Sequence, residues 1–276
     1  MVPEKICFRP VKVLGTYMEY GDWGEAGAFD KKGSVKKVYL PDSIEEISTG
    51  CFSNCNHLEE IRLSESLREI PYHAFWACES LQSVEIPEGV EVIGRSAFAV
   101  CQNLEYVRLP ESLKIIQSAA FVRCEALETV EIPAGVEEIE GDSFGGTGWE
   151  EGFKEDFVIV GKNVLIYYGG NEREVKVPEG VEYIGFQVFY YTEEMESLEL
   201  PVSLKKCGIC MVSSIGNENL KYVTVRNPST EFEWDINAGV FSECGSELTL
   251  IGEKGSTAEA YAEKKGYGFV ELQPEE

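Results

Sequence analysis

Cysteine is the residue type of this chain that most suggests chemistry. The 276 residues include nine cysteines, and thiols can form disulfides, bind zinc or act as nucleophiles. Cys207 and Cys210 form a C-x-x-C motif, which occurs in redox pairs and as half of a zinc site. There is no second C-x-x-C, and the only histidines are His57 and His73. We therefore expect both cysteines to be structural, and we predict no metal site and no cofactor.

Four further cysteines share a spacing of 23 residues: Cys55, Cys78, Cys101 and Cys124. Cysteine that is not in a disulfide is among the most buried residue types and behaves as a small hydrophobe. Stacked parallel strands lie about 4.8 Å apart, which also permits a disulfide between neighbours. We expect reduced, buried thiols, and bridged pairs are the alternative.

No catalytic set can be assembled with any specificity. Ser-His-Asp and Cys-His arrangements need a suitably placed histidine, whereas His57 and His73 occupy phases of the repeat described below that favour the surface. The 49 acidic residues could form a carboxylate pair for glycoside hydrolysis by chance. The glycine-rich stretch 145–148 lacks the Lys-Ser/Thr of a P-loop. We predict that the protein is not an enzyme, and a carboxylate-dependent hydrolase is the enzymatic alternative.

A 23-residue repeat must position these residues. Its unit reads L-x-x-V-x-I-P-x-x-V-x-x-I-x-x-x-A-F-x-x-C-x-x, which alternates apolar and polar residues before a proline and so predicts one short strand plus a return path. One unit buries too little apolar surface to offset the entropy lost on ordering it, so the coils must stack into a solenoid. The repeat is clearest in five phenylalanines: Phe52, Phe75, Phe98, Phe121 and Phe144.

Charges at two outward phases of the repeat alternate in sign from coil to coil. In-register stacking would place each charge between two opposite ones, which is favourable. The turns alternate as well, between LPES or LSES and IPEG or IPAG, so the ancestral unit could be a pair of repeats. The two charge series are Arg62, Glu85, Arg108, Glu131, Lys176, Glu199 and Glu45, Arg68, Glu91, Lys114, Glu137.

The array is interrupted once and capped at its ends. An irregular coil over about 145–174 contains FVIVGKNVLIYYG, which predicts a β-hairpin around Gly161-Lys162-Asn163. A capping box at 256–259 predicts a helix from Ala258 to Lys265, followed by a strand over 268–272. We assign residues 1–33 to an N-terminal cap, 34–272 to the repeat domain and 273–276 to a tail.

The 23-residue unit, with its Ala-Phe, its following Cys and its Ile-Pro or Leu-Pro, resembles the BspA-like leucine-rich repeat family. The closing IGEKGSTAEAYAEKKGYGFV and the inserted hairpin resemble segments of that family too. The resemblance implies an α/β-type, mostly β, right-handed solenoid with a parallel β face, a hairpin interruption and a C-terminal helix and strand. It also implies a bacterial or protozoan protein, extracellular or at the cell surface, with adhesion or host-protein binding.

Composition restricts the partners. A formal net charge of −25 repels phosphates, so we expect no nucleic acid partner. The apolar runs are only a few residues long, so we expect no membrane insertion. Residues 1–20 show no signal peptide, which leaves a cytoplasmic location open. We expect a monomer.

Tyrosines outside the repeat's core phases are the candidate binding residues. Tyr106 and Tyr222 should project from the strand face, and Trp76 shares its phase with Tyr190. Tyrosine-rich patches suit protein recognition, although the hairpin tyrosines could instead fill the gap left by the irregular coil. We predict a module that binds a host or matrix protein, or alternatively a structural segment of a larger surface protein. The hairpin candidates are Tyr167, Tyr168, Tyr190 and Tyr191.

Overall fold

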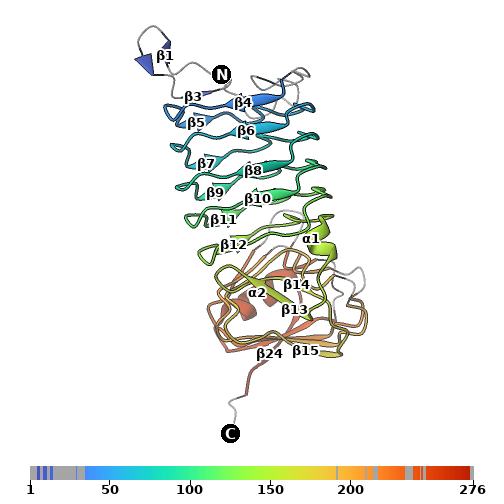
Figure 1. Ribbon diagram of the computed structural model, residues 1–276. Helices are drawn as coiled ribbons and strands as arrows, with labels where there is room; N and C mark the ends of the chain where they lie inside the picture. The colour runs from blue at the N-terminus through green and yellow to red at the C-terminus, as the bar shows by residue number, and fades with distance from the viewer. Residues whose placement is uncertain are drawn as a thin grey trace. The chain divides into compact units, whose positions relative to one another are not determined.

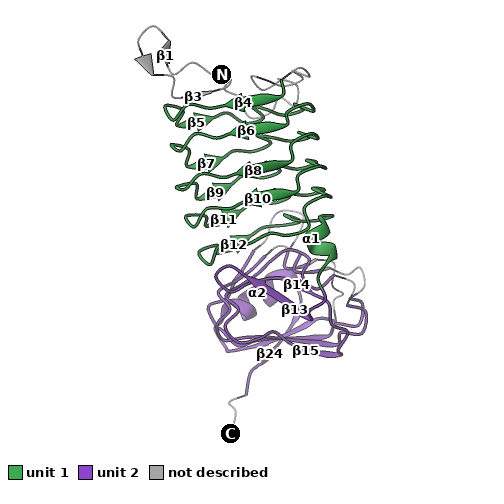
Figure 2. Ribbon diagram, viewed as in Figure 1, with its two compact units in different colours: residues 1–153 green, residues 154–276 purple. Residues whose placement is uncertain are grey.

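The chain folds into two compact units of stacked coils, residues 1–153 and 154–276, in a computed structural model (Figure 2). The division falls within the irregular coil predicted over 145–174. The structure describes residues 5–6, 9–10, 13–14, 29, 35–190, 192–208, 210–213, 217–233, 239–242, 244 and 247–273.

Unit 1 stacks short parallel strands in register (Figure 1). The predicted strand forms a first face in four coils, in which β4 (Lys37–Tyr39) pairs with β6 (Glu60–Arg62), and β8 (Ser83–Glu85) pairs with β10 (Tyr106–Arg108). Residues 129–131, at the same phase of the next coil, form no strand. Partners are 23 residues apart, as Val84 and Val107 show. This register confirms the solenoid that the repeat predicts.

Each coil of unit 1 contains a second strand, whereas the sequence predicted only one strand and a return path. The reason is that the return path also stays in register, so its backbone bonds to the preceding coil, as Glu91 N–H does to the Arg68 carbonyl over 3.0 Å. Its parallel strands are β3 (Val13–Leu14) with β5 (Glu46–Ile47), and then β7 (Glu69–Ile70), β9 (Val92–Ile93), β11 (Ile115–Ile116) and β12 (Glu138–Ile139). An antiparallel pair, β1 (Lys5–Ile6) and β2 (Arg9–Pro10), precedes them.

A file of stacked phenylalanine rings forms the centre of unit 1. Consecutive rings from Phe29 to Phe144 lie parallel, with centroids 5.1–5.3 Å apart. The predicted interior file is therefore confirmed. The file ends where Trp149, in α1 (Gly148–Glu151), meets Phe144 edge-on at 4.8 Å. Phe153 then packs edge-on against Trp149 at 5.0 Å.

Two positions in each bend around the Ala-Phe pair adopt left-handed backbone. At the first position φ is +61° at Gly50 and +55° at His73, and at the second it is +63° at Val100 and +68° at Gly146. This conformation costs an ordinary side chain about 1 kcal/mol or more. Inter-coil hydrogen bonds, such as the 2.7 Å bond from Phe75 N–H to the Ala97 carbonyl, hold the bend in place.

The alternating turns are joined by a serine clamp, which we define as a serine hydroxyl that bridges to the preceding coil. Ser112 Oγ accepts from Gly89 N–H at 2.9 Å and donates to the Val90 carbonyl at 2.8 Å. Ser203 makes the same two bonds to Gly180 and Val181. Gly89 has φ +98°, and a Cβ there would lie 2.7 Å from Arg68 Nη1. The Ser and Gly turns are therefore complementary at these two junctions, whereas at the first junction Ser66 Oγ donates to the Asp42 carbonyl at 2.7 Å.

Unit 2 begins with the predicted hairpin, an antiparallel pair of β13 (Phe157–Val160) and β14 (Val164–Tyr168). Unit 2 has two five-stranded sheets, of which the one that contains the hairpin is mixed and the other is parallel. One sheet continues from β14 through β16 (Tyr183–Ile184) and β18 (Lys206–Cys207) to β21 (Glu231–Phe232). The other comprises β15 (Glu174–Lys176), β17 (Ser197–Leu200), β20 (Tyr222–Val225), β23 (Thr249–Gly252) and β24 (Gly268–Glu271), and β19 (Val212–Ser213) pairs with β22 (Phe241–Ser242).

The C-terminal elements confirm the predicted helix and strand. Helix α2 (Thr257–Lys265) begins where Ser256 Oγ accepts from Glu259 N–H, and it ends at Gly266 with φ +74°. No helix in the described part of the chain is long and apolar enough to cross a bilayer. The limits of the N-terminal cap at 1–33 and the tail at 273–276 concern residues that lie mostly outside the described ones, and they stay predictions.

The serine clamp makes a testable contribution to stability. We expect Ser112→Ala to lower the free energy of unfolding by about 1 kcal/mol, because Gly89 N–H loses its partner. Ser83→Ala, on the exposed strand face, is the matched control and should change it by less than about 0.5 kcal/mol. Urea denaturation measures both, and equal stability of the two variants would contradict the clamp.

Candidate protein-binding surface

The outward side chains of β4, β6, β8 and β10 form one surface, which we call the unit 1 face. The middle residue of each strand points into the core and the flanking residues are exposed. The face therefore has two parallel files of side chains, and neighbours within a file belong to successive coils. Its members are Lys37, Tyr39, Glu60, Arg62, Ser83, Glu85, Tyr106 and Arg108.

Charges on the unit 1 face are largely neutralised by one another. Lys37 Nζ lies 2.6 Å from Glu60 Oε2, and Arg108 Nη1 lies 3.7 Å from Glu85 Oε2. The hydrogen bond from Lys37, followed by that from Tyr39, lowers the pKa of Glu60. The Glu85–Arg108 pair confirms the predicted alternation at that step.

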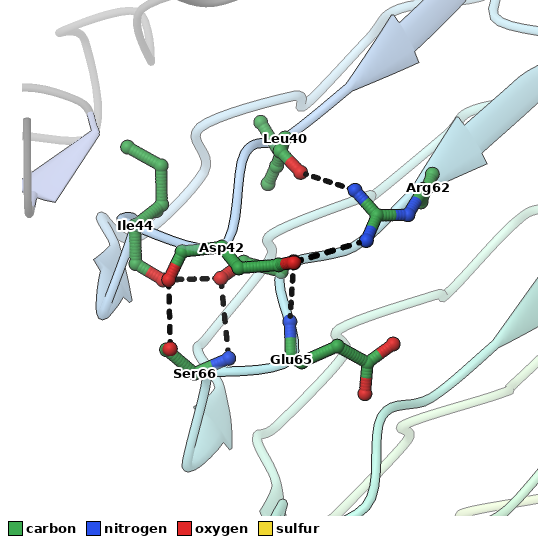
Figure 3. Close-up of polar contacts among 7 residues, drawn as sticks. Leu40, Asp42, Ile44, Arg62, Glu65 and Ser66 are labelled. Atoms are coloured by element: carbon green, nitrogen blue, oxygen red, sulfur yellow. Dashed lines mark hydrogen bonds and ion pairs between the residues drawn. The ribbon is translucent and has the colours of Figure 1, made fainter. Parts of the chain in front are cut away.

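Arg62 departs from that alternation by bonding to a turn. Its guanidinium lies 3.0 Å from the Asp42 carboxylate and donates to the Leu40 carbonyl at 3.2 Å (Figure 3). Asp42 also accepts from Glu65 N–H at 3.3 Å. Arg62 is thus held at the rim of the unit 1 face by the turn that precedes its own coil.

Tyrosines are the prominent uncharged groups of the unit 1 face. Tyr106 is 51% exposed, as predicted, and Tyr39 is 37% exposed. Sequence reasoning did not single out Tyr39, although its phase, shared with Arg62 and Glu85, was a sufficient signal. The Tyr39 hydroxyl donates to Glu60 at 2.5 Å, which fixes the ring beside the Lys37 pair.

Unit 2 presents an equivalent surface, the unit 2 face, on the outward side of the sheet from β15 to β24. Tyr222 is 50% exposed and immediately precedes buried Val223, just as Tyr106 precedes buried Val107. Lys176 Nζ lies 3.2 Å from the Glu199 carboxylate, which confirms another predicted pair. Each unit therefore exposes one tyrosine at the same phase of the repeat.

The hairpin tyrosines lie in different surroundings. Tyr168 is only 4% exposed, and its ring lies 4.8 Å from that of Phe157 and 5.3 Å from that of Phe189. Burial, and then its hydrogen bond to Glu172, raises the pKa of Tyr168. Tyr168 thus fills the core, which was the alternative considered for this group. Tyr167 and Tyr190 are half-buried, and Tyr191 lies outside the described residues.

The cysteine file lies inside unit 1 and its thiols act as hydrogen-bond donors. Each Sγ donates to the carbonyl of the phenylalanine in the preceding coil, at 3.1 Å from Cys55 and 3.2 Å from Cys78, Cys101 and Cys124. None of the described cysteines is in a disulfide, and these four are fully buried. Burial raises the pKa of Cys78 and Cys101 well above the usual range.

Hydrogen-bond donors continue at this phase beyond the four cysteines. Thr147 donates to the Phe144 carbonyl of its own coil at 2.7 Å, and Asn217 donates to the Phe189 carbonyl of the preceding coil at 2.7 Å. The position therefore requires a small donor for an interior carbonyl, and a thiol meets that need without redox chemistry.

The C-x-x-C residues lie at a core phase and at a bend phase of the repeat, which correspond to Ile93 and Ser96. Cys207 is buried in β18 opposite Ile184, and Cys210 stands at a left-handed bend with φ +52°. Burial raises the pKa of Cys207. Within the described ranges, no group of three or more His, Cys, Asp or Glu side chains is placed to hold a metal ion.

Two carboxylates have raised pKa values, but the arrangement is that of a helix start. Burial raises the pKa of Asp142, and burial also raises the pKa of Glu150. Glu150 Oε2 accepts from Gly146 N–H at 3.1 Å while Thr147 Oγ1 accepts from Glu150 N–H at 3.2 Å. Thr147 is thus the N-cap of α1, and the Glu150 carboxylate accepts from the residue before it in a variant of the capping box, so Glu150 gives no support to a hydrolase.

Native alkylation should distinguish buried thiols from bridged ones. We expect iodoacetamide at pH 8 to leave Cys78 and Cys101 unmodified in the folded protein, because burial removes both access and the thiolate. Both should react after denaturation without reductant, as peptide mass spectrometry would show. Val202→Cys, at a site that is 59% exposed, is the reactive control. Cysteines of the cysteine file that stay unmodified after denaturation would indicate disulfides.

Asp142→Asn should stabilise the protein at neutral pH. Burial penalises the charged carboxylate of Asp142 and so raises its pKa. The folded protein is therefore destabilised above this raised pKa, and the destabilisation disappears below 3.8, the ordinary pKa of the group. We expect a higher Tm for the variant at pH 7, with the gain shrinking as pH falls through the raised pKa. Asparagine also suits φ +57°, but that benefit would persist at pH 3. A gain that does not depend on pH would contradict the electrostatic cause.

Comparison with known proteins finds similar solved structures and a matching family model. No curated protein has a significantly similar sequence. Among solved structures, a leucine-rich repeat protein from Eubacterium ventriosum is 26% identical over 42% of this chain and 31% of its own, with a TM-score of 0.40. This chain therefore spans less than a third of that relative.

Two further structures match nearly the whole chain at lower identity. The pneumococcal vaccine antigen PcpA is 18% identical over 99% of this chain and 88% of its own, with a TM-score of 0.48. A leucine-rich cell surface protein from Faecalibacterium prausnitzii is 20% identical over 99% and 87%, with a TM-score of 0.43.

The family model for the BspA type leucine rich repeat region matches in six copies, over residues 25–148 and 162–256. The matched ranges contain the phenylalanine file, the cysteine file and the alternating turns, and they leave out only the two ends and part of the irregular coil. The chain therefore belongs to the BspA type leucine-rich repeat family.

Proposed function

We propose that the protein is a non-enzymatic binding module that holds a protein partner on its strand faces. The observation that carries this proposal is the pair Tyr106 and Tyr222, which are 51% and 50% exposed at the same phase of the two faces. Tyrosine offers a large amphipathic contact area and is enriched at interfaces. The ion pairs Arg108–Glu85 and Lys176–Glu199 lie on the same faces as the two tyrosines and resemble the polar rim of a protein interface.

The preferred partner is a basic protein. The chain carries a formal net charge of −25, whereas the two faces hold internally paired charges. The long-range field is therefore negative, which steers a basic partner, while the contact surface itself carries little charge to repel it. Binding of this kind weakens as salt screens the field.

Family membership supports a module of a bacterial protein that works outside the cell or at its surface, in adhesion or contact with a host or matrix protein. Glu150, whose pKa is raised by burial, bonds at the start of α1 and so does not favour the hydrolase alternative. A purely structural role within a longer surface protein is the competing proposal, and it requires no partner for Tyr106 and Tyr222.

The test is binding of purified matrix proteins, basic and acidic, to the full chain by surface plasmon resonance. We expect a basic partner to bind, and we expect the double variant Tyr106→Ala/Tyr222→Ala to weaken it at least tenfold, about 1.4 kcal/mol. Affinity should fall as salt is raised from 50 to about 500 mM.

Val202→Ala is the matched control, because Val202 is 59% exposed but lies in a turn outside both faces. It should leave affinity unchanged. A bound partner that is insensitive to the tyrosine variants would remove the faces as the site. Affinity that is constant or rises with salt would contradict the basic partner.

A further inference from the structure

Three aromatic side chains gather on one bend of unit 1, away from the strand faces. The Tyr72 and His73 rings are stacked with centroids 3.7 Å apart, and His73 and Trp76 are stacked at 5.7 Å. The interplanar angles are 17° and 26°. All three side chains are half-buried, so each keeps part of its ring accessible. We call this group the aromatic bend.

Other coils show that the fold does not need these rings. The same three phases in the other bends of unit 1 carry small or polar residues, and those bends have the same backbone turn. His73 even occupies a left-handed position with φ +55°, where the preceding coil has Gly50. The equivalent sets are Thr49, Gly50, Ser53; Arg95, Ser96, Ala99; Ser118, Ala119, Val122; and Gly141, Asp142, Gly145.

The backbone of the aromatic bend is occupied by neighbouring coils. The Tyr72 carbonyl accepts from Gly50 N–H at 3.0 Å, and the Trp76 carbonyl accepts from Asn54 N–H at 2.8 Å. His73 N–H donates to the Arg95 carbonyl at 3.1 Å. These backbone groups are therefore not available to a peptide that would bind by main-chain hydrogen bonds. A ligand at this site must be recognised by ring surfaces and side-chain polar groups.

The polar groups near the aromatic bend suit hydroxyls. In the preceding coil, the Asn54 amide donates to Ser53 Oγ at 3.1 Å, which places an amide and a hydroxyl at the phases beside Trp76 and Ala77. Arg95, in the following coil, is exposed and close enough to help lower the pKa of His73, although burial is the larger cause. The local Arg95 disfavours a cation, and the net charge of −25 disfavours an anion.

We propose that the aromatic bend binds the ring of a neutral saccharide. One face of a pyranose carries C–H groups that pack on an aromatic ring, and its hydroxyls both donate and accept hydrogen bonds. Trp76 would provide the packing surface, and Ser53, Asn54 and Arg95 the polar contacts. This site is separate from the protein-binding faces, so the chain could engage a glycan and a protein at once.

Unit 2 carries a related pair at the same two outer phases of its own bend. Phe186 corresponds to Tyr72 and Tyr190 to Trp76, and both are half-buried. Aromatic residues therefore recur at these phases in both units while the other described bends of unit 1 lack them. A weaker second site for the same class of ligand follows for unit 2.

The test titrates maltose, cellobiose, lactose and N,N′-diacetylchitobiose into the full chain by isothermal titration calorimetry. We expect at least one to bind with a Kd in the millimolar range, about −4 kcal/mol or slightly tighter. Trp76→Ser should weaken that binding at least tenfold. The substitution should fold, because serine occupies the same phase at Ser53, and circular dichroism would verify this.

Tyr106→Ala, on the unit 1 face, is the control and should bind the sugar as the parent does. Decaproline serves as a rival probe for a peptide that packs on rings without strand addition. The proposal is overturned if no sugar binds at about 10 mM, if Trp76→Ser binds equally well, or if decaproline alone binds through Trp76. Loss of protein binding in the Tyr106 variant with sugar binding retained would separate this site from the proposed protein-binding function.

Discussion

Contact between each coil and its neighbour in register is the constraint on which the structure depends, and in unit 1 the offset between paired strands is 23 residues. It aligns the strand backbones, places the phenylalanine rings 5.1–5.3 Å apart and sets each cysteine thiol against a carbonyl of the coil before it. A single coil has no such partners and cannot satisfy its own backbone. The stability of the array therefore comes largely from the interfaces between neighbouring coils and not from any one coil alone.

The register also determines how strictly each phase of the repeat restricts the residue type. Core phases accept almost one residue type, because a different ring or donor would disturb two neighbours. Outward phases on the strands must only avoid like charges, and outward phases on the bends must only tolerate a left-handed turn. The fold does not require surface aromatics such as Tyr106 and Trp76, so their presence is better explained by binding than by folding.

Spacing in the sequence was sufficient to predict the phenylalanine file, the parallel face, the hairpin and the terminal helix, because each repeats or carries a strong turn or cap signal. The second strand of each coil was missed, since two residues such as Glu69–Ile70 are too short to show a period. The burial of Tyr168 beside half-buried Tyr167 was also missed, because both faces of the hairpin carry apolar residues and alternation alone does not show which face meets the core. The stacking of His73 between Tyr72 and Trp76 depends on a bend geometry that spacing does not specify.

The serine clamp has a consequence for how such arrays change length. The N–H of a glycine-bearing turn needs a serine in the next coil, as Gly89 needs Ser112. Two serine turns can lie side by side, because Ser66 Oγ donates to the Asp42 carbonyl at 2.7 Å. Removal of one coil that set two glycine turns side by side would leave a glycine N–H without its acceptor. Loss of coils in twos keeps each clamped glycine turn next to its serine, so the array can change length without breaking a clamp.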